Sequence, residues 1–531
     1  MARPELRNDD GGSFLESRDY ARVRFAGDSG DGMQLTGTQF AASTALAQND
    51  FATLPDYPAE IRAPVGTVYG VSSYSINFGS TEIFTSGDRA DLLVVMNPAG
   101  LKTQIDDLRT GGLIIFDEGA FTDRNLTKAG YGSSPVDDGS LAPYQTLPIN
   151  MTQLTLQAVE GFGLGRKNSL RCKNMWALGL VLWIFKRDRT SITDWLNKKF
   201  AAVPELAAAN VAALNAGHAY GETAEIPEYF STISMPPAAL APGEYRTATG
   251  IESLGLGLIA AAKLADLPLY FASYPITPAS PLLHLLSRHK DQGVVTFQAE
   301  DEIAAVCSAI GASFSGCLAV TSSSGPGIAL KTEAIGLAVA AELPLVVVNV
   351  QRGGPSTGLP TKTEQSDLLQ AVYGRNGDTP LPVIAASNAQ DCFECAIEAA
   401  RLAIKYMTPV MLLLDGYIAN AAEPWRLPDL DDIGPIDVDF RQDPNGFQPY
   451  LRVEETLARP WAVPGTPGLE HRIGGLERDA DTGNISYDPA NHDLMTRIRS
   501  QKILGIAKDV PPQEIGHGHE SGDIVVVGWG A

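Results

Sequence analysis

The sequence predicts an α/β protein built from two doubly wound domains with parallel sheets. Short apolar runs alternate with longer segments of helical periodicity, first over residues 23–220 and again from residue 247. The runs at residues 92–96 and 113–116 show no polar alternation, which is typical of parallel strands that helices bury on both faces. Strands and helices that alternate in this way form open parallel sheets with helices on both sides.

Composition excludes several classes of protein. The 531 residues suffice for about three or four domains. The net charge of −22 argues against nucleic acid or an anionic membrane as a partner, since both need basic patches. Residues 1–10 are polar and lack the apolar core of a signal peptide, and no apolar run reaches the roughly 20 residues of a membrane span. With five scattered cysteines, we expect a cytoplasmic protein.

Cys392 and Cys395 are the one pair of cysteines with the spacing of a metal or redox site. They lie in residues 388–407, whose apolar side chains follow a helical period, and no second pair completes four ligands. We therefore expect both cysteines on a buried helix and no iron–sulfur cluster in this chain.

The first domain opens with a predicted strand at residues 23–26, a glycine-rich turn at residues 27–32 and a helix from Met33. This arrangement offers backbone N–H groups and a helix N-terminus to a phosphate. Tight packing of strand on helix explains such a turn about as often as ligand binding does. Gly30-Asp31-Gly32 also resembles the start of the thiamine diphosphate metal motif, but residues 58–64 lack the asparagine that this motif requires, so we reject a metal site here.

Residues 67–77 alternate polar and apolar side chains and suit an edge hairpin. Asn97 and Asp117 follow the predicted strands 92–96 and 113–116 and cap their carboxyl ends.

The rest of the first domain is predicted to be helical. A strongly apolar helix opens at Lys173-Asn174 and ends near residue 185, and residues 190–220 look helical. Residues 221–246 are rich in Pro and Thr and are predicted to be a linker. The first domain therefore spans residues 1–220.

The second domain is predicted over residues 247–420. Its strands are expected at residues 269–272, 294–297, 318–322, 345–350, 382–386 and 409–414. Its main helices are expected at residues 250–266, 302–314, 328–342 and 388–407. Residues 421–520 are predicted to form a loop-rich connector. An apolar strand at residues 523–528 cannot form a domain alone, so either it begins a further, truncated α/β domain at residues 521–531 or it completes the sheet of another chain.

Polar side chains follow three of these strands at their carboxyl ends. Tyr274-Pro275-Ile276-Thr277-Pro278 is a stiff loop after strand 269–272, because proline lacks an N–H and restricts its predecessor. Glu302 begins a helix of small residues after strand 294–297. Ligands bind at this edge of open α/β sheets, so we expect the Thr277 hydroxyl and the Glu302 carboxylate to form a site.

Arg352 follows strand 345–350 within a glycine-rich segment, where its guanidinium can bind a carboxylate in bidentate fashion. An isolated arginine after a strand is about as often a surface ion-pair partner as it is a binding residue. A binding role for Arg352 is favoured because Thr277, Glu302 and the Ser-Gly loop at residues 322–327 are predicted to lie at the same edge of the sheet.

At these residues the chain resembles the 2-oxoacid:ferredoxin oxidoreductases, in the form that carries a gamma domain fused ahead of the alpha subunit. The resemblance rests on Tyr-Pro-Ile-Thr-Pro-Ala-Ser at 274–280, Glu302 with Gly311-Ala312, Thr-Ser-Ser-Ser-Gly-Pro-Gly at 321–327, and Gln-Arg-Gly-Gly-Pro-Ser-Thr-Gly-Leu-Pro-Thr-Lys-Thr-Glu-Gln at 351–365. The first domain matches through Gly-Asp-Ser-Gly-Asp-Gly at 27–32 and through Lys173-Asn174.

The resemblance implies the pyrimidine-binding half of a thiamine diphosphate enzyme. Such an enzyme oxidatively decarboxylates a 2-oxoacid, with 2-oxoglutarate favoured here, to acyl-CoA and CO₂ and passes electrons to ferredoxin, or runs in reverse. A beta subunit in an (αβ)₂ assembly would carry the diphosphate, its Mg²⁺ and a [4Fe–4S] cluster.

The resemblance also implies roles for individual residues. Glu302 would hydrogen-bond the pyrimidine ring nitrogen and favour the imino tautomer of the cofactor. Arg352 would hold the substrate carboxylate, and Thr277 would bind the carboxylate or the keto oxygen. Further cofactor contacts are expected at Pro275, Ile276 and Ser323. Contacts to coenzyme A are expected at Gly27, Ser29, Gly30, Asp31, Gly32 and Asn174.

Two other classes remain open from the sequence. One is a different thiamine diphosphate enzyme, a lyase or a transketolase-like protein, which would share the glutamate but lack the first domain. The other is a regulatory subunit that binds coenzyme A or a nucleotide and has no chemistry of its own.

Overall fold

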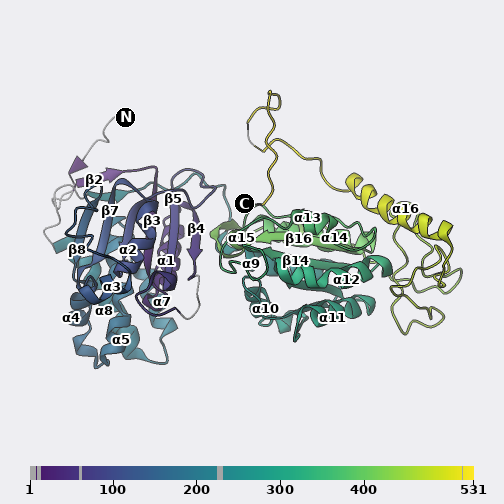
Figure 1. Cartoon of the computed structure of the whole chain (residues 1–531), viewed down its shortest axis with the longest axis horizontal. Helices are drawn as coiled ribbons and strands as arrows, with labels where there is room; N and C mark the ends of the chain where they lie inside the picture. The colour runs from purple at the N-terminus through teal and green to yellow at the C-terminus, as the bar shows by residue number, and fades with distance from the viewer. Residues whose placement is uncertain (1–6, 9–13, 59–62, 224–230, 517, 531) are drawn as a thin grey trace. The chain divides into compact units, whose positions relative to one another are not determined.

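The computed structural model describes residues 7–8, 14–58, 63–223, 231–516 and 518–530. It divides into two compact units, namely Met1–Thr247 with Ala421–Arg426, and Ala248–Asn420 with Leu427–Ala531 (Figure 1). Among the described residues each unit contains a six-stranded sheet with helices packed on it. The predicted fold class, α/β with two doubly wound domains, is confirmed, with one antiparallel strand inside the first sheet.

The first sheet is mixed. Its strands, in spatial order, are β4 (Asp50–Asp56), β5 (Val71–Gly79), β3 (Tyr20–Asp28), β6 (Ala90–Val95), β7 (Leu108–Asp117) and β8 (Gln145–Ile149). β3, β6, β7 and β8 are parallel, whereas β5 runs antiparallel to both of its neighbours. The predicted strands at residues 23–26, 92–96 and 113–116 are present as β3, β6 and β7.

The edge hairpin predicted within residues 67–77 is wrong. These residues form a 3-10 turn, Val68–Gly70, and then the single strand β5, whose nine residues are all buried between β4 and β3. The polar side chains that suggested a solvent-facing strand find partners inside the protein. Asn77 Nδ2 donates to Thr85 O at 2.9 Å, and the Ser72 hydroxyl donates to Asp56 O at 3.3 Å. A polar side chain with such a partner is compatible with an interior strand.

Helices cover both faces of the first sheet. The larger core contains side chains of α1 (Met33–Leu46), α6 (Lys173–Ile184), α7 (Thr190–Lys199) and α8 (Pro204–Thr223), and the smaller core contains α2 (Pro98–Gln104). The predicted helices after Met33 and at residues 173–185 and 190–220 are confirmed. α6 and α8 pack backbone against backbone because Gly217 has no side chain: a Cβ there would lie 1.8 Å from Trp176 O.

The remaining elements of the first unit are short. The helices are α3 (Asp123–Lys128), α4 (Met151–Ala158) and α5 (Arg166–Arg171). β1 (Arg7–Asn8), β2 (Phe14–Ser17) and β9 (Ser231–Ser234) form a small sheet, and β10 (Tyr245–Thr249) pairs with β17 (Ala422–Arg426).

The second sheet is wholly parallel. Its strands, in spatial order, are β12 (Val294–Gln298), β11 (Leu269–Ser273), β13 (Leu318–Ser323), β14 (Leu345–Gln351), β16 (Pro409–Asp415) and β15 (Val383–Ala385). All six predicted strands are present. One face packs against α9 (Gly250–Leu264), α10 (Ser280–Leu286) and α14 (Asp391–Tyr406), and the other against α11 (Glu302–Phe314), α12 (Gly325–Ala341) and α13 (Leu368–Tyr373). A short helix, α15 (Gly416–Asn420), follows β16.

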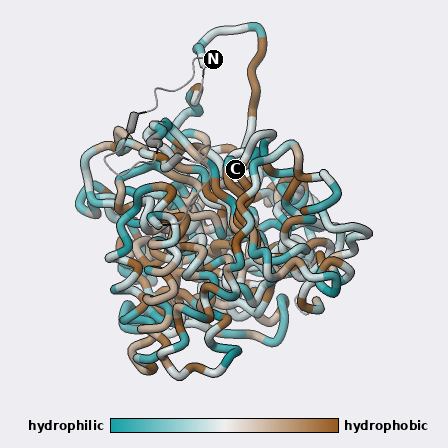
Figure 2. The backbone as a smooth tube through the Cα atoms, turned by 90° about the vertical axis from the view of Figure 1, so that its left-hand side faces the viewer, coloured by the Kyte–Doolittle hydropathy of each residue, from teal (hydrophilic) through white to brown (hydrophobic). Residues whose placement is uncertain are grey.

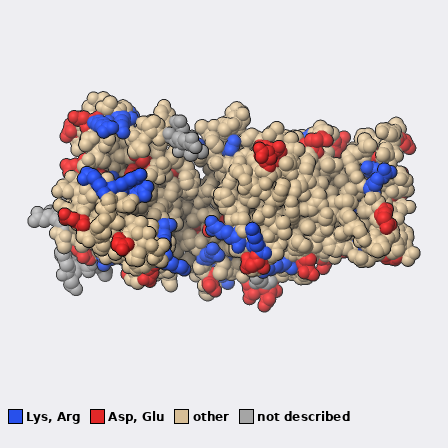
Figure 3. Space-filling view, turned by 90° about the horizontal axis from the view of Figure 1, so that it is seen from below, with Lys and Arg blue, Asp and Glu red and all other residues tan. Residues whose placement is uncertain are grey.

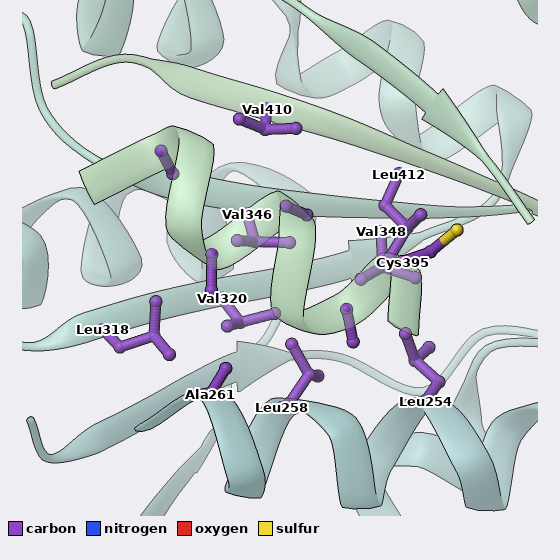
Figure 4. Packing of buried hydrophobic residues seen from close by; sticks show 14 of the residues in the cluster. Leu254, Leu258, Ala261, Leu318, Val320, Val346, Val348, Cys395, Val410 and Leu412 are labelled. Carbon is purple, nitrogen blue, oxygen red and sulfur yellow. The ribbon is translucent and has the colours of Figure 1, made fainter. Parts of the chain in front are cut away.

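The larger core of the second unit lies between the sheet and the helices α9 and α14 (Figure 4). Val348 and Leu412 from neighbouring strands and Leu258 of α9 all belong to this core, and all three are fully buried. Each such side chain contributes about 1.5–3 kcal/mol by leaving water.

The predicted position of Cys392 and Cys395 on a buried helix is confirmed. Both lie on α14 with their side chains in this core, and Figure 4 shows Cys395 among the aliphatic groups. Burial first, and the nearby Asp391 carboxylate second, raise the pKa of the Cys395 thiol. Metal and redox sites use the thiolate form, which this environment disfavours.

Within the predicted segment 421–520, residues 427–510 pack against the second unit and contain a long helix, α16 (Pro489–Gly505). From here on, the connector means residues 427–510. α16 was not predicted, because its apolar side chains show little periodicity. Its start carries the usual local signal: Pro489 is the first helical residue, and Asp488 accepts a hydrogen bond from Ala490 N at 2.9 Å.

A buried ion cluster holds the connector in place. Glu342, at the end of α12, is 2 % exposed, and its carboxylate binds Lys502 Nζ at 2.5 Å and Arg452 Nε at 3.0 Å. Arg459 Nε donates to the main-chain oxygens of Ala341 and Glu342 at 3.0 and 2.9 Å. Burial alone would raise the pKa of Glu342, but Lys502 and Arg452 outweigh it and hold that pKa below its ordinary value.

The strand predicted at residues 523–528 is wrong for this structure. The segment is irregular, and Ile524, Val525, Val526 and Val527 are 83, 70, 89 and 88 % exposed. Figure 2 shows it as an isolated hydrophobic stretch near the top of the view. A strand forms only where a neighbour accepts its backbone hydrogen bonds, and no described strand pairs with these residues.

Two surface properties agree with the composition. Among the described residues, no helix is both long and apolar enough to cross a bilayer. The face shown in Figure 3 carries separate acidic and basic groups, so the net charge of −22 is not gathered into one acidic surface there.

Candidate active site at the carboxyl ends of the second sheet

Tyr274 and Glu302 meet where β11 and β12 end. Tyr274 follows β11 directly and is 8 % exposed, and its hydroxyl donates to Glu302 Oε1 at 2.6 Å. Glu302 is the first residue of α11, and the side chain of Asp301 caps that helix by accepting from Ala304 N at 2.8 Å. Burial first, and the Glu302 carboxylate second, raise the pKa of the Tyr274 hydroxyl, so Tyr274 is a hydrogen-bond donor at neutral pH.

The first turn of α12 packs against this pair. The Tyr274 hydroxyl lies 3.0 Å from Ser323 Oγ at the end of β13, and Ser323 is fully buried. Gly327 permits this packing: a Cβ there would lie 2.0 Å from Ser323 Oγ and 2.4 Å from the Tyr274 hydroxyl. Any side chain at position 327 would therefore displace the groups that hold Glu302.

Lys331 of α12 lies beneath Glu302 and is fully buried. Its Nζ donates to Glu302 O and to Thr321 Oγ1, each at 3.0 Å, and lies 5.6 Å from the centre of the Tyr274 ring. Burial lowers the pKa of Lys331 to about 8, against the opposing effect of the Glu302 charge.

Arg352 joins the site from the end of β14. Its Nη1 donates to the main-chain oxygen of Thr277 at 2.6 Å, which ties it to the loop after β11. Arg352 is 8 % exposed, and burial lowers the pKa of its guanidinium. The loop is itself fixed, because Ser280 Oγ accepts from Ile276 N at 2.8 Å and donates to Ile276 O at 2.9 Å.

Several buried polar atoms at this edge of the sheet have no partner among the described residues. They are Arg352 Nε, Ser324 Oγ and Asn349 Oδ1. Unpaired buried polar atoms are rare in folded proteins and each requires an explanation, such as a bound molecule. Donors and acceptors gathered at the carboxyl ends of β13 and β14 fit a polar ligand.

The segment after Arg352 is anchored at both ends. Near its start, Gly353 N donates to Lys362 O at 2.9 Å and Gly354 N to Glu364 Oε2 at 2.6 Å. At its far end, Gln365 Nε2 donates to Asp415 Oδ2 at 2.8 Å, and Asp367 N donates to Gln351 Oε1 at 3.0 Å. The loop beside Arg352 is therefore held in one arrangement by groups at the ends of β14 and β16.

The structure brings the three predicted catalytic positions to one edge of the sheet. Arg352 contacts the main chain of Thr277, whose side chain is exposed, and Tyr274 contacts Glu302. Of the predicted cofactor contacts, Pro275 is exposed and Ile276 half-buried, while Ser323 lies behind Tyr274.

Tyr274 and Lys331 were not among the predicted site residues. A signal for Lys331 was present: it falls on the apolar stripe of α12 between Ile328 and Ile335, where a charged side chain must be buried.

The predicted coenzyme A contacts of the first unit also lie together. Asp31 Oδ2 accepts from Asp28 N at 2.9 Å and from Asn97 Nδ2 at 3.2 Å. Gly32 adopts φ +77°, and a Cβ there would lie 2.4 Å from Asn174 Nδ2, so Asn174 contacts the turn.

Packing accounts for one glycine of this turn and not for another. A Cβ at Gly27 would lie 2.8 Å from Asp31 Oδ2, whereas a Cβ at Gly30 would meet nothing within 4 Å. Gly30 and the neighbouring Ser29 are exposed, which leaves their backbone accessible to a ligand. Among the described residues, no three His, Cys, Asp or Glu side chains are grouped to hold a metal ion.

Comparison with known families divides the chain as the fold does. Residues 261–487 match the thiamine diphosphate-binding model of pyruvate flavodoxin/ferredoxin oxidoreductases, and residues 22–220 match the pyruvate ferredoxin/flavodoxin oxidoreductase model. The chain is 55 % identical over 509 residues to the 2-oxoglutarate oxidoreductase subunit KorA of Mycobacterium tuberculosis, covering 96 % of this chain and 77 % of the relative. The 2-oxoacid:ferredoxin oxidoreductase 1 alpha subunit of Aeropyrum pernix is 29 % identical, over 83 % of this chain and 72 % of its own.

A solved structure agrees with these matches. The 2-oxoglutarate:ferredoxin oxidoreductase of Magnetococcus marinus, solved with 2-oxoglutarate, coenzyme A and succinyl-CoA bound, superposes with a TM-score of 0.80 at 30 % identity, covering 94 % of this chain and 82 % of that one. The chain therefore belongs to the 2-oxoacid:ferredoxin oxidoreductase family, as a subunit of such an enzyme with a thiamine diphosphate-binding domain.

Proposed function

We propose that this chain holds the aminopyrimidine side of thiamine diphosphate and the 2-oxoacid in an enzyme that converts 2-oxoglutarate and coenzyme A to succinyl-CoA and CO₂, or catalyses the reverse. The observation that carries the proposal is the Glu302 carboxylate, fixed by Tyr274 at the same edge of the sheet as Arg352. The substrate is inferred from the Mycobacterium tuberculosis and Magnetococcus marinus proteins, which are both named for 2-oxoglutarate.

The residues at the sheet edge fit the cofactor. Glu302 Oε1 accepts from Tyr274, which leaves Oε2 to meet the protonated ring nitrogen of the aminopyrimidine. A carboxylate at that nitrogen favours the imino tautomer, whose nitrogen acts as the base. Thiamine diphosphate, when bound, supplies the carbon nucleophile and the electron sink for decarboxylation. Tyr274 and Ser323 keep Glu302 in one orientation, which a preorganised acid–base partner requires.

Arg352 and Thr277 fit the substrate. A guanidinium with an unpaired Nε, held in a mostly buried position, binds a carboxylate through charge-assisted hydrogen bonds that water does not weaken. The exposed Thr277 side chain lies beside it and can donate to the substrate carboxylate or to the keto oxygen. The oxoacid is thereby oriented with its reacting carbon toward the Glu302 side of the site.

The diphosphate, its Mg²⁺ and a [4Fe–4S] cluster are assigned to a separate beta subunit. Apolar side chains next to Glu302 support a protein partner there: Val295 and Phe297 on β12 and Ile303 on α11 are 51, 43 and 53 % exposed. Within the described part of the chain, β12 pairs with β11 alone and so leaves one backbone edge open. Exposed apolar side chains beside an open edge are typical of surfaces that another chain covers. Ferredoxin would receive the electrons from the cluster in the assembled (αβ)₂ enzyme.

Coenzyme A is assigned to the first unit. The exposed backbone at Ser29 and Gly30 precedes α1, a position suited to a phosphate group. Burial raises the pKa of the neighbouring Asp28, and the charges of Lys128 and Lys173, which oppose this shift, lie beside the turn. Asn174 completes the set through its contact with Gly32.

The first test compares the chain alone with the assembled enzyme. Expressed alone, the chain should neither decarboxylate 2-oxoacids nor show visible cluster absorbance. Together with the beta subunit it should reduce ferredoxin, with an absolute requirement for coenzyme A and the highest kcat/KM for 2-oxoglutarate among pyruvate, 2-oxobutyrate and 2-oxoglutarate. Turnover by the chain alone would contradict the division between two subunits.

A second test addresses Arg352. Arg352→Gln removes a charge-assisted hydrogen bond of about 1.5–3 kcal/mol, so kcat/KM for 2-oxoglutarate should fall by roughly 10- to 150-fold. Cofactor content should stay at the parent level. Arg288→Gln, on an arginine in the polar turn after α10, is the matched control and should leave kcat/KM unchanged. Equal kinetics for the two variants would show that Arg352 only ties the loop to β14.

A further inference from the structure

Lys331 is a buried amine that the reaction described above does not use. Lys331 is 0 % exposed, and the two groups that accept hydrogen bonds from Nζ, the main-chain oxygen of Glu302 and the Thr321 hydroxyl, are both uncharged. Burying an ammonium group without an ion pair disfavours folding. A methionine would fill the same space at less cost, so the presence of an amine at this point requires another explanation.

The surroundings of Nζ all belong to the candidate active site. Thr321 from β13 and the main-chain oxygen of Glu302 accept its hydrogen bonds, and Tyr274 presents its ring face. The titratable groups that face Nζ are Glu302, Asp301 and Cys307 from α11, and Tyr274 from the loop after β11. Lys331 therefore touches the backbone of Glu302 and the residue that orients the Glu302 carboxylate.

We propose that Lys331 is a positioning residue, whose buried positive charge keeps the Glu302 carboxylate ionised and fixed when the aminopyrimidine covers it. This inference rests on the proposed role of Glu302. A bound pyrimidine excludes water from Glu302, which disfavours the charged carboxylate. A nearby cation opposes that effect, because the low dielectric of the interior strengthens the attraction between the cation and the carboxylate. The hydrogen bond to Glu302 O also fixes the start of α11, so charge and position are supplied by one side chain.

A binding experiment separates this role from a structural one. Thiamine diphosphate and its 1′-deaza analogue, in which C–H replaces the ring nitrogen that meets Glu302, are titrated into the assembled enzyme by calorimetry. The parent should prefer thiamine diphosphate, because only the natural ring offers a protonated nitrogen to the carboxylate. Lys331→Met should reduce this preference by about fivefold or more, within the range of couplings in one hydrogen-bond network. Lys290→Met, the same change at an exposed position, should keep the parent preference.

The parent enzyme provides a second arm that needs no substitution. Lys331 loses its charge as pH rises through about 8, because burial lowers its pKa from the ordinary 10.5. The preference for thiamine diphosphate over the analogue should therefore fall between pH 7 and pH 9 in the parent and stay flat in Lys331→Met. If the variant fails to assemble, this pH profile decides the question.

Each outcome has one meaning. If Lys331 had only a structural role, its substitution would change the affinities for thiamine diphosphate and for the analogue together, and the preference for thiamine diphosphate would stay intact. An unchanged preference in Lys331→Met therefore overturns the proposal. A preference that does not vary with pH in the parent overturns it as well. A parent that binds both compounds equally well would instead overturn the role of Glu302 itself.

Discussion

Glu302→Gln should slow exchange of the C2 proton of bound thiamine diphosphate by about 10²–10⁴-fold in the assembled enzyme, the usual contribution of a positioned acid–base partner. The amide keeps the size of the side chain and can still accept from Tyr274, but it no longer carries the negative charge that favours a protonated pyrimidine nitrogen. Exchange into deuterium oxide is followed without substrate, at full cofactor occupancy, so that neither turnover nor binding confuses the measurement.

The matched control is Glu300→Gln, which makes the same change on the exposed carboxylate that follows β12. It should exchange at the parent rate. If Glu302→Gln also exchanges at that rate, Glu302 serves the start of α11 and has no role in the chemistry.

The second large effect concerns stability. Glu342→Gln leaves Arg452 and Lys502 buried without their carboxylate, and losing one member of a buried ion cluster destabilises by about 3–5 kcal/mol. The connector should be released first, since Glu342 joins it to α12. Amide hydrogen exchange across residues 427–510 should become faster, and the midpoint of urea unfolding of the second unit should fall.

Acid should reproduce part of this effect in the parent. The pKa of Glu342 is lower in the folded protein than its ordinary 4.5, so its stabilising contribution is complete above that value and is lost as pH falls further. Glu333→Gln, on the exposed face of α12, is the control and should unfold as the parent does. If the amides of the connector exchange as slowly in Glu342→Gln as in the parent, the apolar contacts of the connector hold it on the second unit without the ion cluster.

The sequence predicts the second sheet well because its signals are local. Solid apolar runs mark strands that are buried on both faces, and Glu302 follows Asp301, a residue type that caps helices. The strand β5 was misjudged because its polar side chains bind groups elsewhere in the first unit, which no alternation pattern reveals. The segment at residues 523–528 has strand-like residues, yet a strand also depends on a neighbour, which the pattern does not report.

The candidate site also combines local signals, which the sequence shows, with contacts between distant residues, which it does not show. Thr277, Glu302 and Arg352 were predicted because each follows a strand, and parallel topology brings such residues to one edge. The contacts that hold them were not predictable. Lys331 is 29 residues from the Glu302 oxygen it binds, and Tyr274 is 28 residues from the Glu302 carboxylate, so these contacts depend on how α11 and α12 pack on the sheet.

The anchoring of the loop beside Arg352 has a consequence for engineering substrate preference. Gln351 and Asp367 tie its two ends together, and Gln365 is fixed to Asp415. Residues 354–364 thus lie between these anchors, and Gly354 and Glu364 also hold each other within the segment. If Arg352 binds the oxoacid as proposed, grafting this segment from relatives that accept other oxoacids should change substrate preference and leave Tyr274, Glu302 and Lys331 in place.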